Sequence, residues 1–180
     1  MYISMVALNS ADNYEQHQAI WSLFPDMPDR KRDHLFRIEG EQGAKRMALL
    51  QSSSIPKTSN KAQVLQSKPF DLKLSNGEYF KFKLVANPTK RITETKKVIE
   101  LKNEAEQITW LQRKLAGANV TVTSIDSHLI KSKKTFSSRF VTFEGVLQVT
   151  NAKQIHALVI MGVGRKKHAG AGLLSLARAS

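Results

Sequence analysis

Apolar residues recur with two periods along this chain of 180 residues, one of two and one close to 3.6. The first period is typical of a strand with one buried face, and the second is typical of an amphipathic helix. Three helices are expected, because Asp12, Asn103 and Asn151 each stand three positions before a Glu or Gln, as in a capping box. The first helix is expected to run to about Phe24, and Gly117 to stop the second.

Alternating segments predict strands in both halves of the chain. Asn76-Gly77 is a strong hairpin signal, so we expect Phe70–Leu74 and Tyr79–Ala86 to pair across it. One face of the second segment carries an aromatic ring among lysines, which suits either single-stranded RNA or a plain solvated surface. The other expected strands are Tyr2–Leu8, His34–Glu39, Lys45–Gln51, Val98–Leu101, Asn119–Ile130, Arg139–Val149 and a short final strand at Leu173–Leu176.

The order of these elements indicates the fold class. From Val98 onward the order is strand-helix-strand-strand-helix-strand, which is ferredoxin-like. The first half begins in the same way, but its second helix has to be short or replaced by segment 56–68. We therefore expect an α+β protein of tandem ferredoxin-like (RRM-like) modules with paired antiparallel sheets, a frequent frame for RNA recognition. The expected domains are 1–90 and 98–180, joined by a polar, basic linker at 91–97.

The composition narrows the function. Lys and Arg number 28 against 15 acidic residues, a net charge of +13, which points to nucleic acid or an anionic surface and away from an enzyme of neutral metabolites. The chain has no cysteine and its 5 histidines are scattered, so we expect neither disulfides nor a metal site. No apolar run is long enough for a membrane span, and the amino terminus lacks the features of a signal peptide. The expected location is the cytoplasm.

A glycine-rich basic stretch lies near the carboxyl terminus. Glycine allows close approach of a backbone to a bulky partner, and Arg and Lys donate to phosphate, so the stretch suits a polyanion against the main chain. It is not a phosphate-binding Walker loop, because no Gly-Lys-Ser/Thr opens a helix after it. A flexible basic connector is an alternative interpretation. The stretch contains Gly162, Gly164, Arg165, Lys166, Lys167, His168, Gly170 and Gly172.

The first predicted helix carries Tyr14 and His17 one turn apart on the same side. Histidine titrates near neutral pH and is the usual acid–base catalyst, but on this pattern alone a core-edge histidine beside aromatic residues is the more frequent case. Two further basic runs stand in predicted loops, Arg30-Lys31-Arg32 and the hairpin tip at 131–134.

Ordered blocks across nearly the whole chain resemble the CasE family, the CRISPR repeat endoribonucleases of type I-E Cascade complexes. They are Met-Tyr-Ile-Ser at the start, Tyr14-Glu-Gln-His-Gln-Ala-Ile-Trp-Ser-Leu-Phe-Pro25, Arg32-Asp-His-Leu-Phe36, Leu84-Val-Ala-Asn-Pro-Thr-Lys90, Glu104-Ala-Glu-Gln-Ile-Thr-Trp-Leu-Gln-Arg-Lys-Leu115, Phe143-Glu-Gly-Val-Leu147 and the glycine-rich stretch.

This resemblance implies a protein that binds the stem-loop of a CRISPR repeat, cuts once at the 3′ base of the stem, and stays bound to the crRNA as a Cascade subunit. The family's catalytic histidine falls on His17, with a tyrosine at Tyr14, and its loop lysine falls on Lys167. A basic catalytic residue from the second module matches Lys134 best, with Arg139 close behind. The chain departs from the family pattern there, because the insert before Phe136 and the linker region are both short.

The chemistry requires neither metal nor cofactor. The 2′-hydroxyl beside the scissile phosphate is the nucleophile, so the enzyme has to move two protons and offset charge on the phosphorane. We assign the acid–base role to His17, positioning or proton relay to Tyr14, and electrostatic stabilisation to Lys134. Whether His17 is base or acid stays open. The expected RNA contacts are the glycine-rich stretch and Arg30, Lys31, Arg32, Lys131, Lys133 and Arg139.

Two other functions remain compatible with the sequence. The first is a structural RNA-binding subunit that caps the crRNA 3′ hairpin without cutting. The second is a DNA-binding or ribosome-associated basic protein, which the charge alone permits.

Overall fold

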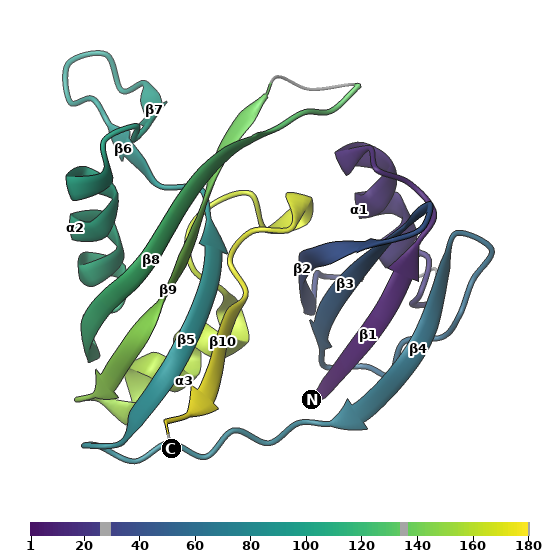
Figure 1. Cartoon of the computed structure of the whole chain (residues 1–180), viewed down its shortest axis with the longest axis horizontal. Helices are drawn as coiled ribbons and strands as arrows, with labels where there is room; N and C mark the ends of the chain where they lie inside the picture. The colour runs from purple at the N-terminus through teal and green to yellow at the C-terminus, as the bar shows by residue number, and fades with distance from the viewer. Residues whose placement is uncertain (26–29, 134–136, 180) are drawn as a thin grey trace. The chain divides into compact units, whose positions relative to one another are not determined.

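The computed structural model describes residues 1–25, 30–133 and 137–179. The chain folds into two compact units, each made of a sheet and one or two helices (Figure 1). Unit 1 takes in short segments from the second half of the chain. Its parts are Met1–Asp71, Ile130–Ser137 and Lys167–Gly170, and those of unit 2 are Leu72–Leu129, Ser138–Lys166 and Ala171–Ser180.

Unit 1 has a four-stranded sheet in the order β2-β3-β1-β4. The central strand β1 runs antiparallel to both β3 and β4, and β2 pairs antiparallel with β3. This is the strand order of a ferredoxin-like module, although the residues between β3 and β4 form no helix. Its elements are β1 (Tyr2–Leu8), α1 (Asn13–Trp21), β2 (His34–Gln42), β3 (Lys45–Ser52) and β4 (Ala62–Pro69).

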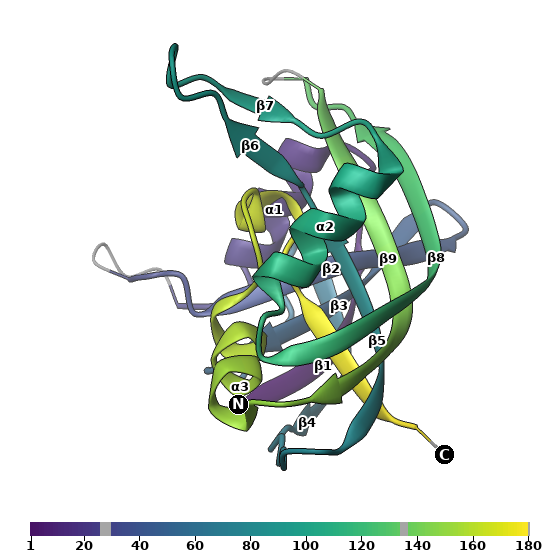
Figure 2. The ribbon, with the colours of Figure 1, turned by 90° about the vertical axis from the view of Figure 1, so that its left-hand side faces the viewer.

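Unit 2 repeats the order as β10-β5-β9-β8, and a separate two-stranded ribbon is formed by β6 and β7. Helices α2 and α3 cover the same face of the sheet (Figure 2). The elements are β5 (Tyr79–Ala86), β6 (Thr89–Arg91), β7 (Val98–Glu100), α2 (Glu104–Lys114), β8 (Ala118–Ile130), β9 (Ser138–Val149), α3 (Ala152–Met161) and β10 (Leu174–Arg178). The predicted tandem ferredoxin-like fold is therefore confirmed.

The three predicted helix starts are also confirmed. Asp12 Oδ2 accepts a hydrogen bond from the backbone of Glu15 at 3.2 Å, which satisfies one of the amides that a helix leaves without a partner. Asn103 and Asn151 cap the other two helices in the same way. The first helix ends at Trp21 and not at Phe24.

The core of unit 1 fixes α1 on its sheet. Ile20 and Leu23 belong to one buried cluster with Phe36 of β2 and Leu50 of β3. Removing this apolar surface from water holds the helix in place. His17, one turn before Ile20 on the same helix, is only partly buried.

The predicted hairpin at Asn76-Gly77 is wrong. Residues 70–78 form no strand, and the last strand of unit 1 is β4, at Ala62–Pro69. The turn still forms, but the amide of Gly77 donates to Val149 at the end of β9, at 2.7 Å. A turn signal between alternating segments predicts the local bend of the chain, but it does not determine which strands pair.

The expected first strand of unit 2, Val98–Leu101, is also wrong, because the first strand of that sheet is β5. β5 pairs with both β9 and β10, whereas Val98–Glu100 pairs only with β6. The division between the units consequently lies between Asp71 and Leu72, which differs from the linker expected at 91–97. Among the described residues, no helix is long and apolar enough to cross a membrane.

Replacing Gly145 with alanine is expected to destabilise unit 2. A Cβ at Gly145 would lie 2.0 Å from the carbonyl oxygen of Thr121 and 3.0 Å from the ring of Phe82, so the sheet has to shift. Such overpacking typically costs about 1–3 kcal/mol. Thermal or urea unfolding measures the effect, with Gly40→Ala as the control, because nothing lies within 4 Å of a Cβ there. Equal unfolding midpoints for the two variants would contradict the prediction.

Candidate active site

A segment from the glycine-rich stretch lies against α1. The rings of His17 and His168 meet edge-on with their centroids 5.8 Å apart. Asn13, one turn earlier on α1, donates from Nδ2 to the backbone oxygen of Ala169 at 2.9 Å. The fold thus brings together the two features that sequence analysis had singled out separately, the helix histidine and the basic glycine-rich stretch.

The backbone of the glycine-rich stretch adopts conformations that few other residues tolerate. At Gly170 φ is +95°, and a Cβ there would lie 3.1 Å from the ring of Phe36. At Gly164 φ is +81°, with a Cβ 3.0 Å from the ring of Trp110. Glycine is therefore required for both the turn and the close packing. Positive φ also occurs at Gly162 (88°), Lys166 (63°) and Gly172 (98°).

Both ends of this stretch are tied to the sheet of unit 2. The amide of Val163 donates to the oxygen of Gly172 at 2.9 Å, and the amide of Gly172 donates to the oxygen of Val85 at 2.8 Å. Lys167 and His168 begin the short 3-10 helix Lys167–Ala169 between these anchors, and Arg165 is exposed. In this conformation the stretch is a loop held by backbone hydrogen bonds.

The environment of His17 favours its neutral form. Burial lowers the pKa of this imidazole, and the positive charge of Arg32 lowers it further, while a backbone hydrogen bond with His168 acts in the opposite direction. The net pKa lies below the ordinary value of 6.5. At neutral pH the ring is therefore mostly uncharged and able to accept a proton.

Tyr14 lies on α1 one turn before His17, as predicted. Its hydroxyl oxygen accepts a hydrogen bond from Gln18 Nε2 at 3.4 Å, which ties it to the following turn of the helix. Tyr14 is partly exposed, so its hydroxyl can also meet a bound partner.

The predicted basic hairpin reaches the amino-terminal end of α1. The backbone amide of Lys133 donates to Asp12 Oδ1 at 3.0 Å, and its Nζ lies 3.6 Å from Glu15. Lys131 is exposed nearby in the sequence, and Lys134 lies outside the described residues. The position of the hairpin agrees with a role at the His17 site, but the third catalytic group stays a prediction.

Arg139 occupies a different environment, at the start of β9. Its amide donates to Glu100 Oε2 at 2.8 Å, and its guanidinium donates to Ser127 at 2.9 Å. The same Glu100 oxygen accepts from Asn87 at 2.6 Å. These bonds fix Arg139 to the base of the β6–β7 ribbon, and a role for it in RNA binding stays a prediction.

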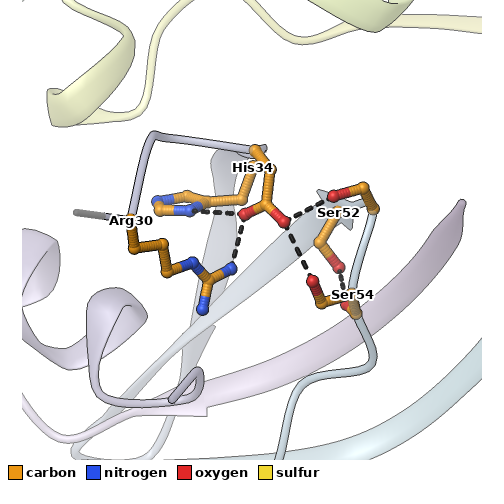
Figure 3. A network of polar contacts seen from close by, with 6 residues as sticks. Arg30, His34, Ser52 and Ser54 are labelled. Carbon is orange, nitrogen blue, oxygen red and sulfur yellow. Dashed lines mark hydrogen bonds and ion pairs between the residues drawn. The ribbon is translucent and has the colours of Figure 1, made fainter. Parts of the chain in front are cut away.

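A polar network that sequence analysis missed surrounds Asp33 (Figure 3). Its carboxylate accepts from Arg30 at 2.5 Å, from Ser54 at 2.9 Å and from Ser53. Burial by itself would raise the pKa of Asp33, but these three hydrogen bonds hold it below the ordinary range. Arg30, expected to bind RNA, has a side chain only 10% exposed and serves mainly this network, whereas Lys31 and Arg32 are exposed.

His34 lies beside this network, between aromatic rings. It stacks on Phe24 at 5.3 Å and meets Trp21 edge-on at 4.9 Å, and Trp21 in turn lies 6.4 Å from the ring of His17. His34 is only 3% exposed. Burial, followed by the charge of Arg32, lowers its pKa to about 4, so His34 is neutral and packs as an aromatic residue.

Only part of this arrangement had a signal in the sequence. Arg30 and Asp33 have the spacing of an i,i+3 ion pair, which could have indicated the network. Ser53 and Ser54, which follow β3, gave no indication, because their partner Asp33 comes from another segment. Among the described residues, no three His, Asp or Glu side chains gather as a metal ion would require.

Acid is expected to destabilise the protein through His34. The unfolded chain takes up a proton near pH 6.5, whereas folded His34 does so only near pH 4. Between these values the unfolded state binds more protons, so the free energy of unfolding falls as the pH is lowered, by up to about 3 kcal/mol. His34→Phe keeps the ring packing and should remove this component. Urea unfolding at pH 7.0, 5.5 and 4.5 measures it.

The control for that experiment is His156→Phe, since His156 is exposed on α3. The control variant should follow the pH dependence of the unchanged protein. Parallel curves for His34→Phe and the unchanged protein would contradict the assignment.

Comparisons with known proteins show the family of this chain. A family model described as CRISPR associated protein matches residues 1–178. The chain is 37% identical to the CRISPR system Cascade subunit CasE of Escherichia coli, over 98% of this chain and 99% of CasE. It is 30% identical to the CRISPR-associated endoribonuclease Cse3 of Thermus thermophilus, over 98% of this chain and 100% of Cse3.

A solved structure shows the same fold over the whole length. Thermus thermophilus Cse3, bound to an RNA representing a pre-cleavage complex, superposes with a TM-score of 0.82 at 28% identity, covering 98% of this chain and 100% of Cse3. The family model matches almost the entire sequence, and both relatives are covered over 99% or more of their own length. This chain belongs to the CRISPR associated protein family that includes CasE and Cse3.

Proposed function

We propose that this protein is a metal-independent endoribonuclease that binds a CRISPR repeat stem-loop and cleaves precursor crRNA at the 3′ base of the hairpin. The observation that carries the proposal is the contact between His17 and the segment Lys167–Gly170, which joins an acid–base group to a glycine-rich basic backbone. Two relatives support it, since Cse3 is named an endoribonuclease and is seen with an RNA in a pre-cleavage state.

The reaction uses the RNA as its own nucleophile. His17 takes the proton of the 2′-hydroxyl, because its lowered pKa keeps the ring neutral and its exposed side faces the loop segment. The 2′-oxygen attacks the neighbouring phosphorus and the bond to the 5′-oxygen breaks, leaving a 2′,3′-cyclic phosphate and a 5′-hydroxyl. General base catalysis of this kind typically accelerates a reaction about 10²–10⁴-fold.

The surrounding groups bind and orient the RNA. Tyr14 positions the reacting nucleotide or relays the second proton, and Lys134 stabilises the charge on the phosphorane. Lys166, Lys167 and His168 bind phosphates close to the main chain, for which their positive charge and hydrogen-bond donors are suited. Lys133, beside α1, adds a further cation near the site.

The product stays bound after cleavage. One relative is named a Cascade subunit, and we extend that role to this chain, with the crRNA hairpin and other Cascade subunits as its partners. The cytoplasm remains its predicted location.

His17→Ala is expected to slow cleavage about 10²–10⁴-fold while leaving RNA affinity nearly unchanged, because the imidazole moves a proton and contributes little to binding. Single-turnover cleavage of a labelled repeat hairpin in EDTA measures the rate, and end analysis identifies the cyclic phosphate. His156→Ala is the matched control, since that histidine is exposed on α3.

A second RNA separates the enzyme from a subunit that only caps the hairpin. A 2′-deoxy substitution at the scissile nucleotide removes the nucleophile, so the protein should bind this RNA and leave it intact. Cleavage of the 2′-deoxy RNA, or full activity of His17→Ala, would overturn the mechanism. If neither RNA is cut but both bind, the protein is the structural subunit.

A further inference from the structure

A groove of about 540 Å³ lies at the carboxyl end of α1. All of its lining residues belong to unit 1. One wall is the end of the helix and the residues that follow it, 22–25, and the opposite wall includes Ser54, Ile55 and Lys57. Arg30 and Asp33 of the polar network line it as well. The groove is therefore distinct from the surface that His17 shares with the loop segment.

The two walls are held together by hydrogen bonds. The amide of Lys57 donates to the oxygen of Leu23 at 2.8 Å, and the hydroxyls of Ser22 and Ser59 lie 2.6 Å apart. Ser53 and Ser54 bind the carboxylate of Asp33 from the same segment. These bonds fix the two described walls relative to each other.

The chemistry of the groove suits one nucleotide. Phe24 is only 6% exposed beneath the guanidinium of Arg30, which lies 4.3 Å from its ring centroid. The apolar contact to a base therefore comes from Ile55, which is 50% exposed. A carboxylate has about four acceptor positions, and Arg30, Ser53 and Ser54 use three at Asp33. The remaining position can accept from a base amino or imino group. Lys57 is exposed and supplies a cation for phosphate.

The groove also lies within reach of the proposed reaction. Ser22, at its edge, follows His17 by five residues, which is about 7.5 Å along a helix. Trp21 connects the two regions, because its ring lies 6.4 Å from His17 and 5.8 Å from the Arg30 guanidinium. A strand whose scissile phosphate meets His17 can therefore place a neighbouring nucleotide in the groove.

We propose that this groove binds the first unpaired nucleotide on the 3′ side of the scissile phosphate. The inference rests on the proposed function, in which the cut lies at the 3′ base of the hairpin. The stem then lies on the 5′ side of the cut and the strand that leaves is single, so its base is available to stack and its edge to form hydrogen bonds. The groove holds this nucleotide before cleavage and releases it afterwards.

Two RNAs test the proposal with the full-length protein. One is the repeat hairpin ending at the cut, and the other continues for three unpaired nucleotides and carries a 2′-deoxy substitution that blocks cleavage. We expect the unchanged protein to bind the longer RNA about five- to tenfold more tightly, in line with the contribution of one stacked base. An abasic first 3′ nucleotide should remove most of this advantage.

Lys57→Glu should abolish the advantage of the longer RNA and leave the affinity for the shorter one unchanged. Lys61→Glu is the matched control, since Lys61 is an exposed lysine of the same segment outside the lining of the groove. Equal affinity of the unchanged protein for both RNAs, or equal losses in the two variants, would overturn the groove assignment. Failure to bind even the shorter hairpin would instead overturn the proposed function.

Discussion

The structure of the site depends on one interaction, the contact between α1 and the segment Lys167–Gly170. Asn13 holds the backbone of Ala169 by a hydrogen bond of 2.9 Å, and Gly170 packs against Phe36 of the same unit with a backbone that excludes a side chain. Without these contacts His17 would be a partly buried helix residue with no part of the glycine-rich stretch beside it. The acid–base chemistry therefore depends on a packing event between segments that are 156 positions apart in the chain.

The charges of the site serve two purposes at once. Cations attract a polyanion, and the nearest of them, Arg32, also lowers the pKa of His17, which keeps the imidazole in the form that accepts a proton. The nearby cation Arg30 has another role. It forms an ion pair with Asp33, and serine hydroxyls hold the carboxylate of Asp33 in place. A neutral His34 then packs against Trp21, which lies on His17. Buried polar groups thus hold the site in shape, while exposed cations remain for the proposed binding of RNA.

Local signals in the sequence predicted local structure well. All three helix starts followed from capping residues, and the repeat of the ferredoxin-like order identified the fold. The predicted hairpin at Asn76-Gly77 was wrong because strand pairing depends on contacts that are distant in the sequence. In the structure β4 pairs with β1, and β5 pairs with β9. Because of this pairing, unit 2 begins at Leu72 and includes β5.

For the site, too, features with a local signal were predicted and features that depend on distant partners were not. The glycine-rich stretch was singled out by its composition, whereas the catalytic roles of His17 and Tyr14 were expected from the family resemblance and not from the helical pattern alone. The network at Asp33 and the burial of His34 were missed, since each depends on partners from separate segments that no pattern joins. The resemblance to a family supplied the expectation that the helix and the loop act together, and the fold supplied the physical reason.

A double-mutant cycle tests this central claim most directly. Asn13→Ala removes the hydrogen bond to Ala169, and single-turnover cleavage is measured for this variant, for His17→Ala and for the two combined. If the seated segment acts by presenting the scissile phosphate to His17, Asn13→Ala slows cleavage by the protein that retains His17 and has almost no further effect once His17 is gone. Losses that multiply as independent effects would contradict the account.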